Sequence, residues 1–444
     1  MPRARYKQLV DQLAADIRAG RLPPGTRLPT HRQLAAREGL ALVTASRVYA
    51  ELEAMGLVSG ETGRGTFVKE IALPPGQGVD LLASAADMVD LSFNYPSLPG
   101  QAEALRAALR QLAQGGDLDA LLRYQPLGGR PHERALAARH LATQGLQVPA
   151  AQVLWVEGAQ HGLMLCGIAL LQPGDVVAVD ALSYPGFKLV AESLRLELLP
   201  IPSSGMGPDV DALAAACRRR RVKALYTMPT LHNPLGWVMS LTRRRELAAL
   251  ARREGLLVIE DGAYAYLAGE APPPLAALAP ERTVHVTGLS KSVAAGLRAG
   301  FVAAPPEAIP RLERALRACS WSTPGLTSAL ACAWLEDGTV ARLETRKRAD
   351  AAERQQLAAE VLGPLRRQGH PSSYFVWLPL GEEVRADQVA MDLLRQGVSV
   401  STAEPYATGP VVPHAIRLAL GSVEIPQLRR ALGRVREVIE ARSY

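Results

Sequence analysis

The chain has 444 residues, of which 48% are hydrophobic and 21% charged, a balance that excludes a disordered or fibrous chain and suits about three domains. Its four cysteines lie far apart without a C-x-x-C pair, which argues against a disulfide framework or a zinc site. The longest uncharged apolar stretch, residues 162–171, is about half of a membrane span, and no signal peptide is recognisable, so we expect a cytoplasmic protein that contacts no membrane.

Positive charge is concentrated at the start of the chain, where three helices are predicted. Residues 1–70 hold eleven basic and seven acidic side chains, which favours a nucleic-acid partner for this segment. Apolar residues at helical spacing predict helices over 7–20, 31–38 and 43–55, and Thr30 is a candidate N-cap for the second. A helix, a tight turn and a second helix are typical of a DNA-reading motif.

Two short β-prone runs follow these helices. Residues 57–58 and 65–68 are joined by a turn sequence, which predicts a hairpin, so residues 1–70 are expected to form a winged helix-turn-helix. Residues 71–88 are irregular and rich in proline and glycine at their centre, as in a linker.

From residue 89 onward, β-rich runs alternate with longer helical segments. This alternation predicts an α/β domain with a mainly parallel sheet. We expect a large part over residues 89–310 and a smaller α+β part over 311–444. The expected strands of the large part cover residues 153–156, 176–180, 224–228, 256–260, 283–287 and 301–304.

One lysine and one arginine form the strongest local chemical signal. Lys291 follows Ser290 near the end of an expected strand, and Arg298 comes seven residues later. A lysine in apolar surroundings near an arginine can form a Schiff base with an aldehyde, while arginine offers a fork for a phosphate. Alone, the same pattern also fits an exposed lysine on a loop.

Other polar residues come at the ends of expected strands. Asp261 lies at the carboxyl end of one, where open α/β sheets place ligands and where a carboxylate can hold a pyridinium nitrogen charged. As an alternative, Asp261 caps the next helix. Asn233 precedes a proline and fits a simple turn equally well. Gly158, Ala159 and Gln160 open a helix whose first amides can bind phosphate.

Taken in order, these motifs resemble the fold type I pyridoxal-phosphate enzymes of the aspartate aminotransferase superfamily, and together with the N-terminal motif they resemble the MocR subfamily of GntR regulators. The resemblance implies a Schiff base between Lys291 and pyridoxal phosphate, with Asp261 on the pyridine nitrogen and Asn233 and Tyr264 on the ring hydroxyl oxygen. It makes Lys291, Asp261 and Tyr264 the catalytic set. The phosphate contacts that it implies come from Gly158, Ala159, Gln160, Ser290 and Arg298.

Three further residues match the family pattern. Tyr184 takes the place of an aromatic side chain that stacks on the cofactor ring, and Arg417 takes the place of the arginine that holds a substrate carboxylate. Tyr124 matches a tyrosine that reaches the phosphate of the neighbouring subunit, which implies a homodimer. The alternatives are ordinary packing for Tyr184 and a surface position for Arg417. The chain departs from the family at Gly288, where a serine or threonine that donates a hydrogen bond to the phosphate is usual.

The GntR resemblance rests on three segments of the sequence, residues 23–35, 49–57 and 63–68. Small polar and arginine side chains at the start of a recognition helix can reach base edges and phosphates. The alternative is a winged helix used only for protein contacts. The residues that the resemblance assigns to DNA are Arg32, Thr44, Ser46, Arg47 and Arg64.

These resemblances predict a transcriptional regulator that binds a double-stranded DNA operator and pyridoxal phosphate. Its effector would be a small amine or amino acid that displaces Lys291 while Arg417 holds its carboxylate. Two rival hypotheses remain: an active aminotransferase with an accessory DNA-binding head, and a sensor of pyridoxal phosphate itself that needs no amine.

Overall fold

The computed structural model describes residues 5–442 with short gaps. The residues outside the described part within that span are 19–20, 24–25, 56, 62–64, 69–87, 116 and 382–383. Most of the predicted linker and Arg64, the predicted wing-tip residue, therefore lie outside the described residues.

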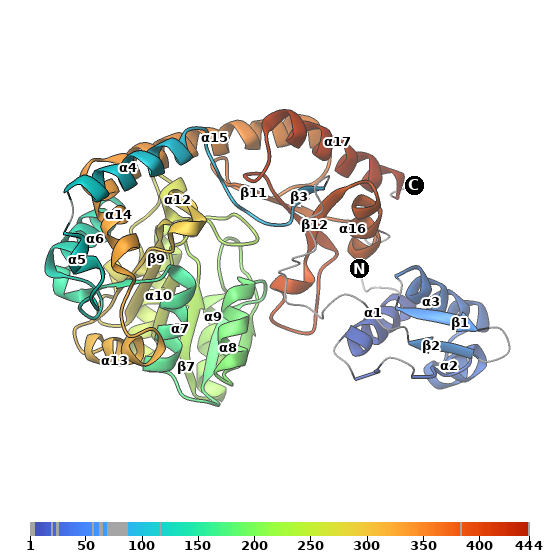
Figure 1. Ribbon diagram of the computed structural model, residues 1–444. Helices are drawn as coiled ribbons and strands as arrows, with labels where there is room; N and C mark the ends of the chain where they lie inside the picture. Colours follow the sequence, from blue (N-terminus) through green and yellow to red (C-terminus); the bar gives the residue numbers. More distant parts are fainter. Residues whose placement is uncertain are drawn as a thin grey trace.

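The N-terminal unit is a small helical domain with a hairpin (Figure 1). Its elements are α1 (Arg5–Arg18), α2 (His31–Glu38), α3 (Leu42–Ala54), β1 (Val58–Glu61) and β2 (Gly65–Val68). The two strands pair antiparallel. Thr30 caps α2 by accepting from the Gln33 amide, as predicted, and Leu34, Val48 and Leu52 are fully buried between the helices. The predicted winged helix-turn-helix fold is confirmed.

The large domain is built on a seven-stranded sheet with the order β4-β10-β9-β8-β7-β5-β6. All neighbouring strands pair parallel except in the two pairs that include β10, β4–β10 and β10–β9, so the predicted parallel-rich sheet is confirmed. The strands are β4 (Val153–Val156), β5 (Val176–Asp180), β6 (Glu197–Ile201), β7 (Val222–Thr227), β8 (Leu257–Asp261), β9 (Thr283–Gly288) and β10 (Gly300–Ala303).

Helices and short 3-10 turns connect and cover these strands. The helices are α4 (Gln101–Gly115), α5 (Leu118–Leu121), α6 (Pro131–Thr143), α7 (Ala159–Leu170), α8 (Pro185–Ser193), α9 (Val210–Arg219), α10 (Leu241–Glu254), α11 (Leu275–Leu278), α12 (Leu289–Ser292), α13 (Ile309–Cys319) and α14 (Gly325–Glu336). The 3-10 turns are η2 (Ala150–Gln152), η3 (Ala265–Leu267) and η4 (Ala295–Leu297). Within the described part of the chain, every helix is too short or too polar to span a bilayer.

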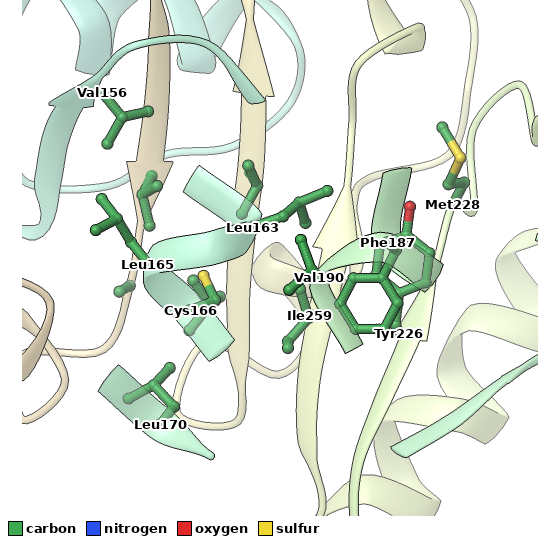
Figure 2. Close-up of a cluster of buried hydrophobic side chains, with 14 of the residues drawn as sticks. Val156, Leu163, Leu165, Cys166, Leu170, Phe187, Val190, Tyr226, Met228 and Ile259 are labelled. Carbon is green, nitrogen blue, oxygen red and sulfur yellow. The ribbon is translucent and has the colours of Figure 1, made fainter. Parts of the chain in front are cut away.

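Figure 2 shows the core between α7, α8 and the sheet. Leu163 and Cys166 of α7 pack there with Val190 of α8, all without exposed surface. The rings of Phe187 and Tyr226 are parallel, with their centroids 3.8 Å apart. This apolar layer packs α7 and α8 against the sheet.

The small domain contains a four-stranded sheet with the order β11-β13-β12-β3. Its elements are β3 (Val89–Leu91), β11 (Phe375–Pro379), α16 (Ala386–Arg395), β12 (Val398–Thr402), η5 (Glu404–Tyr406), β13 (Ala415–Ala419) and α17 (Ile425–Ala441). One prediction needs correction here. The sequence places residues 89–91 in the large part, but β3 pairs parallel with β12, because its apolar residues complete the small-domain core.

Helix α15 (Thr339–Leu362) joins the two domains (Figure 1). Near its start, Val340 and Leu343 belong to a large-domain core cluster. Near its end, Leu357 and Leu362 belong to the small-domain core. One continuous helix therefore takes part in both hydrophobic cores.

Candidate functional site

The predicted site residues come from loops at one edge of the large sheet. Asp261 is the last residue of β8, and Lys291 lies in α12, directly after β9. Asn233 and Tyr264 lie in the segments that follow β7 and β8. Because parallel strands present their carboxyl ends at the same edge, these side chains come together from distant parts of the sequence.

Lys291 contacts a segment that crosses the site after β3. We call residues 92–96 the site strap. The Lys291 amine donates to the main-chain carbonyl oxygen of Asn94 at 2.7 Å, and the side-chain amide of Asn94 donates to the Tyr264 hydroxyl at 3.3 Å. The amine also lies 5.6 Å from the centre of the Tyr95 ring. The structure thus brings Lys291 and Tyr264 to the same side-chain cluster, and Lys291 is not a freely exposed loop lysine.

Asp261 is a buried carboxylate with 1% exposure. It accepts from the Tyr226 hydroxyl and from the Ala263 amide, each at 2.9 Å. Burial raises the pKa of Asp261, while these two donors oppose that shift. A carboxylate in this setting is well suited to pair with a cationic ring nitrogen, because little water is present to compete.

The start of α7 and Arg298 form a cradle for an anion. Gly158 has a φ of 86°, a conformation that favours glycine, and Ala159 opens the helix. A Cβ atom on Gly158 would lie 3.1 Å from an Arg298 guanidinium nitrogen, and that nitrogen donates to the Glu157 carbonyl at 2.9 Å. The first amides of a helix lack helical partners, so they and the guanidinium together suit a phosphate.

Ser290 and Gln160, two further residues predicted to contact the phosphate, each have a buried polar atom. Among the described atoms, the Ser290 hydroxyl and the Gln160 side-chain oxygen have no hydrogen-bond partner. Buried polar groups are normally paired, so these two atoms are free to bond a polar ligand. With the charged groups above, these residues fit a phosphorylated pyridine aldehyde such as pyridoxal phosphate.

Gly288 stands where the family usually has a hydroxyl that donates a hydrogen bond to the cofactor phosphate. The packing around Gly288 explains the difference. A Cβ atom on Gly288 would lie 2.9 Å from the Ala299 carbonyl oxygen and 3.3 Å from the Ala159 amide nitrogen. A serine would therefore crowd one of the helix amides. In this chain the backbone of α7 closely approaches the end of β9 instead.

Tyr184 lies at the start of α8 and is close to the same cluster. Burial raises the pKa of Tyr184, and the nearby Asp261 and Tyr264 add to the shift. The side-chain amide of Gln160 donates to the Gly186 carbonyl at 2.8 Å and so links the start of α7 to the residue two positions after Tyr184.

Arg417 of β13 extends from the small domain toward the large one and is 5% exposed. Its guanidinium donates to the Asn233 side-chain oxygen at 3.0 Å and to the Ser92 carbonyl of the site strap. The rings of Tyr406 and Phe375 lie 5.2 and 5.9 Å from it. Arg417 is therefore not a surface arginine but a buried cation beside Asn233.

Tyr124 is not part of this cluster. It is 81% exposed, and its ring centre lies 5.7 Å from that of Trp321, which is itself 52% exposed.

In the winged helix, the predicted DNA contacts that the structure describes lie in α2 and in the first half of α3. Ser46 lies 3.1 Å from the Nδ1 atom of His31, and Arg32 is exposed. Arg47 lies over the Tyr6 ring at 4.7 Å and 3.6 Å from Glu51. Thr44 is half-buried next to these residues.

Sequence reasoning missed several residues of these sites. At the start of α3, Leu42 and Val43 are 47% and 81% exposed, and apolar side chains at such a place can contact thymine methyl groups. Tyr226 was missed because it lies inside an apolar strand. Asn94 was missed because no local pattern marks the site strap. For the α3 contacts, the sequence does contain a signal, because Leu42 and Val43 are adjacent apolar residues at the start of the predicted helix.

The fold and the site define two joined units, a winged helix and a fold type I aminotransferase-like domain. The family of class I and II aminotransferases matches residues 86–435, and the gntR family of bacterial regulatory proteins matches residues 5–68. The chain thus belongs to the class I and II aminotransferase family, whose cofactor is pyridoxal phosphate. With its GntR domain, it is a member of the MocR subfamily of GntR regulators.

Relatives of both kinds are found. The chain is 30% identical over 418 residues to the uncharacterized HTH-type transcriptional regulator YdeF of Bacillus subtilis, covering 94% of this chain and 90% of YdeF. It is 31% identical over 355 residues to the 2-aminoadipate transaminase of Thermus thermophilus, covering 76% and 87%. The structure of LysN, an α-aminoadipate aminotransferase of Thermus thermophilus complexed with N-(5'-phosphopyridoxyl)-L-leucine, matches with a TM-score of 0.73 and 25% identity, covering 88% and 98%.

Proposed function

We propose that this chain is a cytoplasmic transcriptional regulator whose winged helix binds a double-stranded DNA operator and whose aminotransferase-like domain binds pyridoxal phosphate at Lys291 and senses the cofactor or an amino compound. The observation that carries the proposal is that Lys291 and the buried Arg417 both donate to the site strap, beside a large-domain cluster that contains the buried Asp261, in a chain that also carries a winged helix. We further propose a division into residues 1–70, a linker over 71–88 and an aminotransferase-like domain over 89–444.

Each polar group of the cluster has a proposed part in holding the cofactor. Lys291 supplies the amine for the covalent link, and Asp261 pairs with the pyridine nitrogen. Bound in this way, pyridoxal phosphate stabilises negative charge on the carbon next to an amino group. The other proposed contacts are Asn233 and Tyr264 on the ring hydroxyl, Tyr184 on the ring face, and Gly158, Ala159, Gln160, Ser290 and Arg298 on the phosphate.

Arg417 is the proposed binding group for an effector carboxylate. Its guanidinium now donates to the Asn233 side chain and to the Ser92 carbonyl, both neutral acceptors. A carboxylate is a stronger, bidentate acceptor, so it would compete for these donors. An α-amino acid would thereby contact the small domain through Arg417 and the large domain through the cofactor, in place of Lys291. Ligand contacts that differ between two domain arrangements can shift the balance between them.

The DNA side of the proposal rests on the exposed surface around the start of α3. Thr44, Ser46 and Arg47 are proposed to face the major groove and Arg32 the DNA backbone. Arg64 is proposed for the wing tip.

A homodimer is part of the proposal. Three aromatic and aliphatic residues, Leu122, Tyr124 and Trp321, are 86%, 81% and 52% exposed. Exposed apolar groups of this size mark interaction surfaces. We propose that a second copy covers them and that Tyr124 reaches the phosphate in the partner's site.

Fluorescence anisotropy with DNA from upstream of the gene tests the proposal. The protein is titrated without cofactor, with pyridoxal phosphate, and with the cofactor plus a panel of amino acids, at fixed salt concentration. We expect at least one addition to change the affinity, and we expect Lys291→Ala to abolish the change. An unchanged response in Lys291→Ala would rule out sensing through this lysine.

The residue Arg47 provides a separate test of the DNA contact. Arg47→Ala should weaken operator binding by about 1–3 kcal/mol if the side chain contacts a base. Arg253→Ala, on the exposed end of α10, is the matched control and should bind DNA as the wild type does. Wild-type affinity in Arg47→Ala would refute the placement of the recognition helix.

An active aminotransferase is the second candidate function, favoured by the presence of Lys291, Asp261, Tyr264 and Arg417 in one cluster. A steady-state assay with amino donors and keto acids separates the two, because turnover at rates typical of enzymes would favour catalysis. A sensor of pyridoxal phosphate alone is distinguished by Arg417→Ala, which would then keep full regulation.

A further inference from the structure

A second lysine is buried directly behind Lys291. Lys347 lies near the middle of α15 and has no exposed surface. Its amine donates to three carbonyl oxygens, those of Pro96, Lys291 and Val293, at 2.8, 2.9 and 2.9 Å. An ammonium group has three donors and no acceptor, so these three carbonyls satisfy it completely.

The three carbonyls belong to the two segments that form the immediate surroundings of the Lys291 amine. Pro96 is in the site strap, two residues after Asn94, whose carbonyl accepts from the Lys291 amine. The other two carbonyls are those of Lys291 itself, within the single helical turn α12, and of Val293, the residue directly after it. Lys347 therefore fixes the distance between the backbone of Lys291 and the segment that its own side chain contacts.

A four-residue turn cannot hold its position by its own hydrogen bonds, because an isolated helical turn is unfavourable. The Lys291 carbonyl receives a second bond from outside the turn, from the Tyr266 hydroxyl at 2.8 Å. Tyr266 is in turn tied to α15, since Arg348 donates to its carbonyl at 2.8 Å. Both donors to the Lys291 carbonyl thus depend on the same helix.

We propose that Lys347 is a positioning residue for Lys291, which sets the place of the reactive amine relative to the site strap and to the interdomain helix. The proposal rests on the proposed role of Lys291 as the cofactor-binding amine. Lys347 itself touches neither cofactor nor effector. Burial, and then the positive charge of Lys291, lower the pKa of Lys347 to about 7, because both disfavour the charged form of a buried amine.

A simple contribution to stability is the competing interpretation, and Arg354 offers a matched control. Arg354 lies seven residues further along α15, is 5% exposed and donates to two carbonyls, those of Leu420 and Val423. These carbonyls belong to the small domain and not to the Lys291 turn. Replacing either cation should destabilise the protein, but only the loss of Lys347 should displace Lys291.

The experiment uses the full chain freed of cofactor. Pyridoxal phosphate is added, and capture at Lys291 is followed by absorbance and confirmed by borohydride trapping with mass spectrometry. The visible circular dichroism per bound cofactor reports the orientation of the cofactor. We expect Lys347→Met to slow capture about ten- to a hundredfold and to change the dichroism, because small displacements of a reacting group are costly. Arg354→Met should lower the melting temperature and leave both readouts as in the wild type.

Tyr266→Phe keeps the proposal testable if Lys347→Met does not fold. It removes only the other donor to the Lys291 carbonyl and should shift both readouts in the same direction by less. Wild-type capture and dichroism in a folded Lys347→Met protein, or in Tyr266→Phe if the first does not fold, would overturn the inference. Failure of the wild-type protein to capture pyridoxal phosphate at Lys291 would instead overturn the proposed function.

Discussion

Arg385, at the start of α16 in the small domain, donates a hydrogen bond to the Asp11 carboxylate of α1 in the winged helix at 3.0 Å. The same guanidinium lies 3.7 Å from the Glu51 carboxylate of α3 and 3.6 Å from the Met55 sulfur. Its side chain is only 8% exposed. One arginine of the small domain thus contacts both the first helix and the recognition helix of the DNA-binding unit.

Removing this arginine should loosen the winged helix. Arg385→Ala removes the ion pairs that this guanidinium makes with Asp11 and Glu51, which we expect to cost about 1–3 kcal/mol of local stability. Amide hydrogen exchange in α1 and α3 should become faster. Arg395→Ala, at the exposed end of the same helix, is the control, and equal exchange in the two variants would contradict the prediction.

Placing a serine at Gly288 should weaken cofactor binding and not strengthen it. Although Gly288→Ser introduces a hydroxyl, its Cβ atom would lie 2.9 Å from the Ala299 carbonyl oxygen, and overpacking of this kind costs about 1–3 kcal/mol. Thermal unfolding and titration with pyridoxal phosphate measure both effects. Gly296→Ser is the matched control, since nothing lies within 4 Å of its added Cβ atom. Tighter cofactor binding by Gly288→Ser would disprove this explanation of the glycine.

Tyr226 should control the pH range in which the cofactor binds well. Its hydroxyl donates to Asp261 and opposes the rise in pKa that burial causes there. Tyr226→Phe removes that donor, so the pKa of Asp261 should rise further. Asp261 then becomes protonated, and unable to pair with a cationic nitrogen, at a higher pH. Affinity for pyridoxal phosphate, measured from pH 5 to 9, should weaken as the pH is lowered, and in the variant this weakening should begin at a higher pH than in the wild type. Identical pH profiles would count against the pairing of Asp261 with the cofactor.

Glu344 makes stability depend on pH. Burial raises the pKa of this carboxyl from 4.5 to about 7, so folding favours its protonated form. The contribution of the protonated Glu344 carboxyl to the free energy of unfolding is fully present below pH 4.5 and is lost as the pH rises through about 7. Glu344→Gln should therefore raise the melting temperature more at pH 8 than at pH 5, with an upper limit of about 3 kcal/mol. Glu336→Gln, exposed at the end of α14, should show no such difference, and neither should Glu344→Gln if the carboxyl is charged throughout.

The sequence predicts the regular elements of this fold well, because local patterns encode them. The apolar run Val153–Val156 and the cap Thr30 are found as predicted. Asp261 could be placed at a strand end by the same reasoning. Contacts between distant segments could not be predicted. Residues 89–91 join a sheet more than 300 positions away in the chain, and Lys347 looks like an ordinary polar residue of a long helix.

The pairing of β3 with β12 bears on how a signal could travel to DNA. β3 is the first described strand after the predicted linker, and it belongs to the same four-stranded sheet as β13, which carries Arg417. The hydrogen bond from Arg385 to Asp11 connects the winged helix to the small domain at a second point. A tilt of the small domain against the large one would therefore move the end of the predicted linker and the winged helix together.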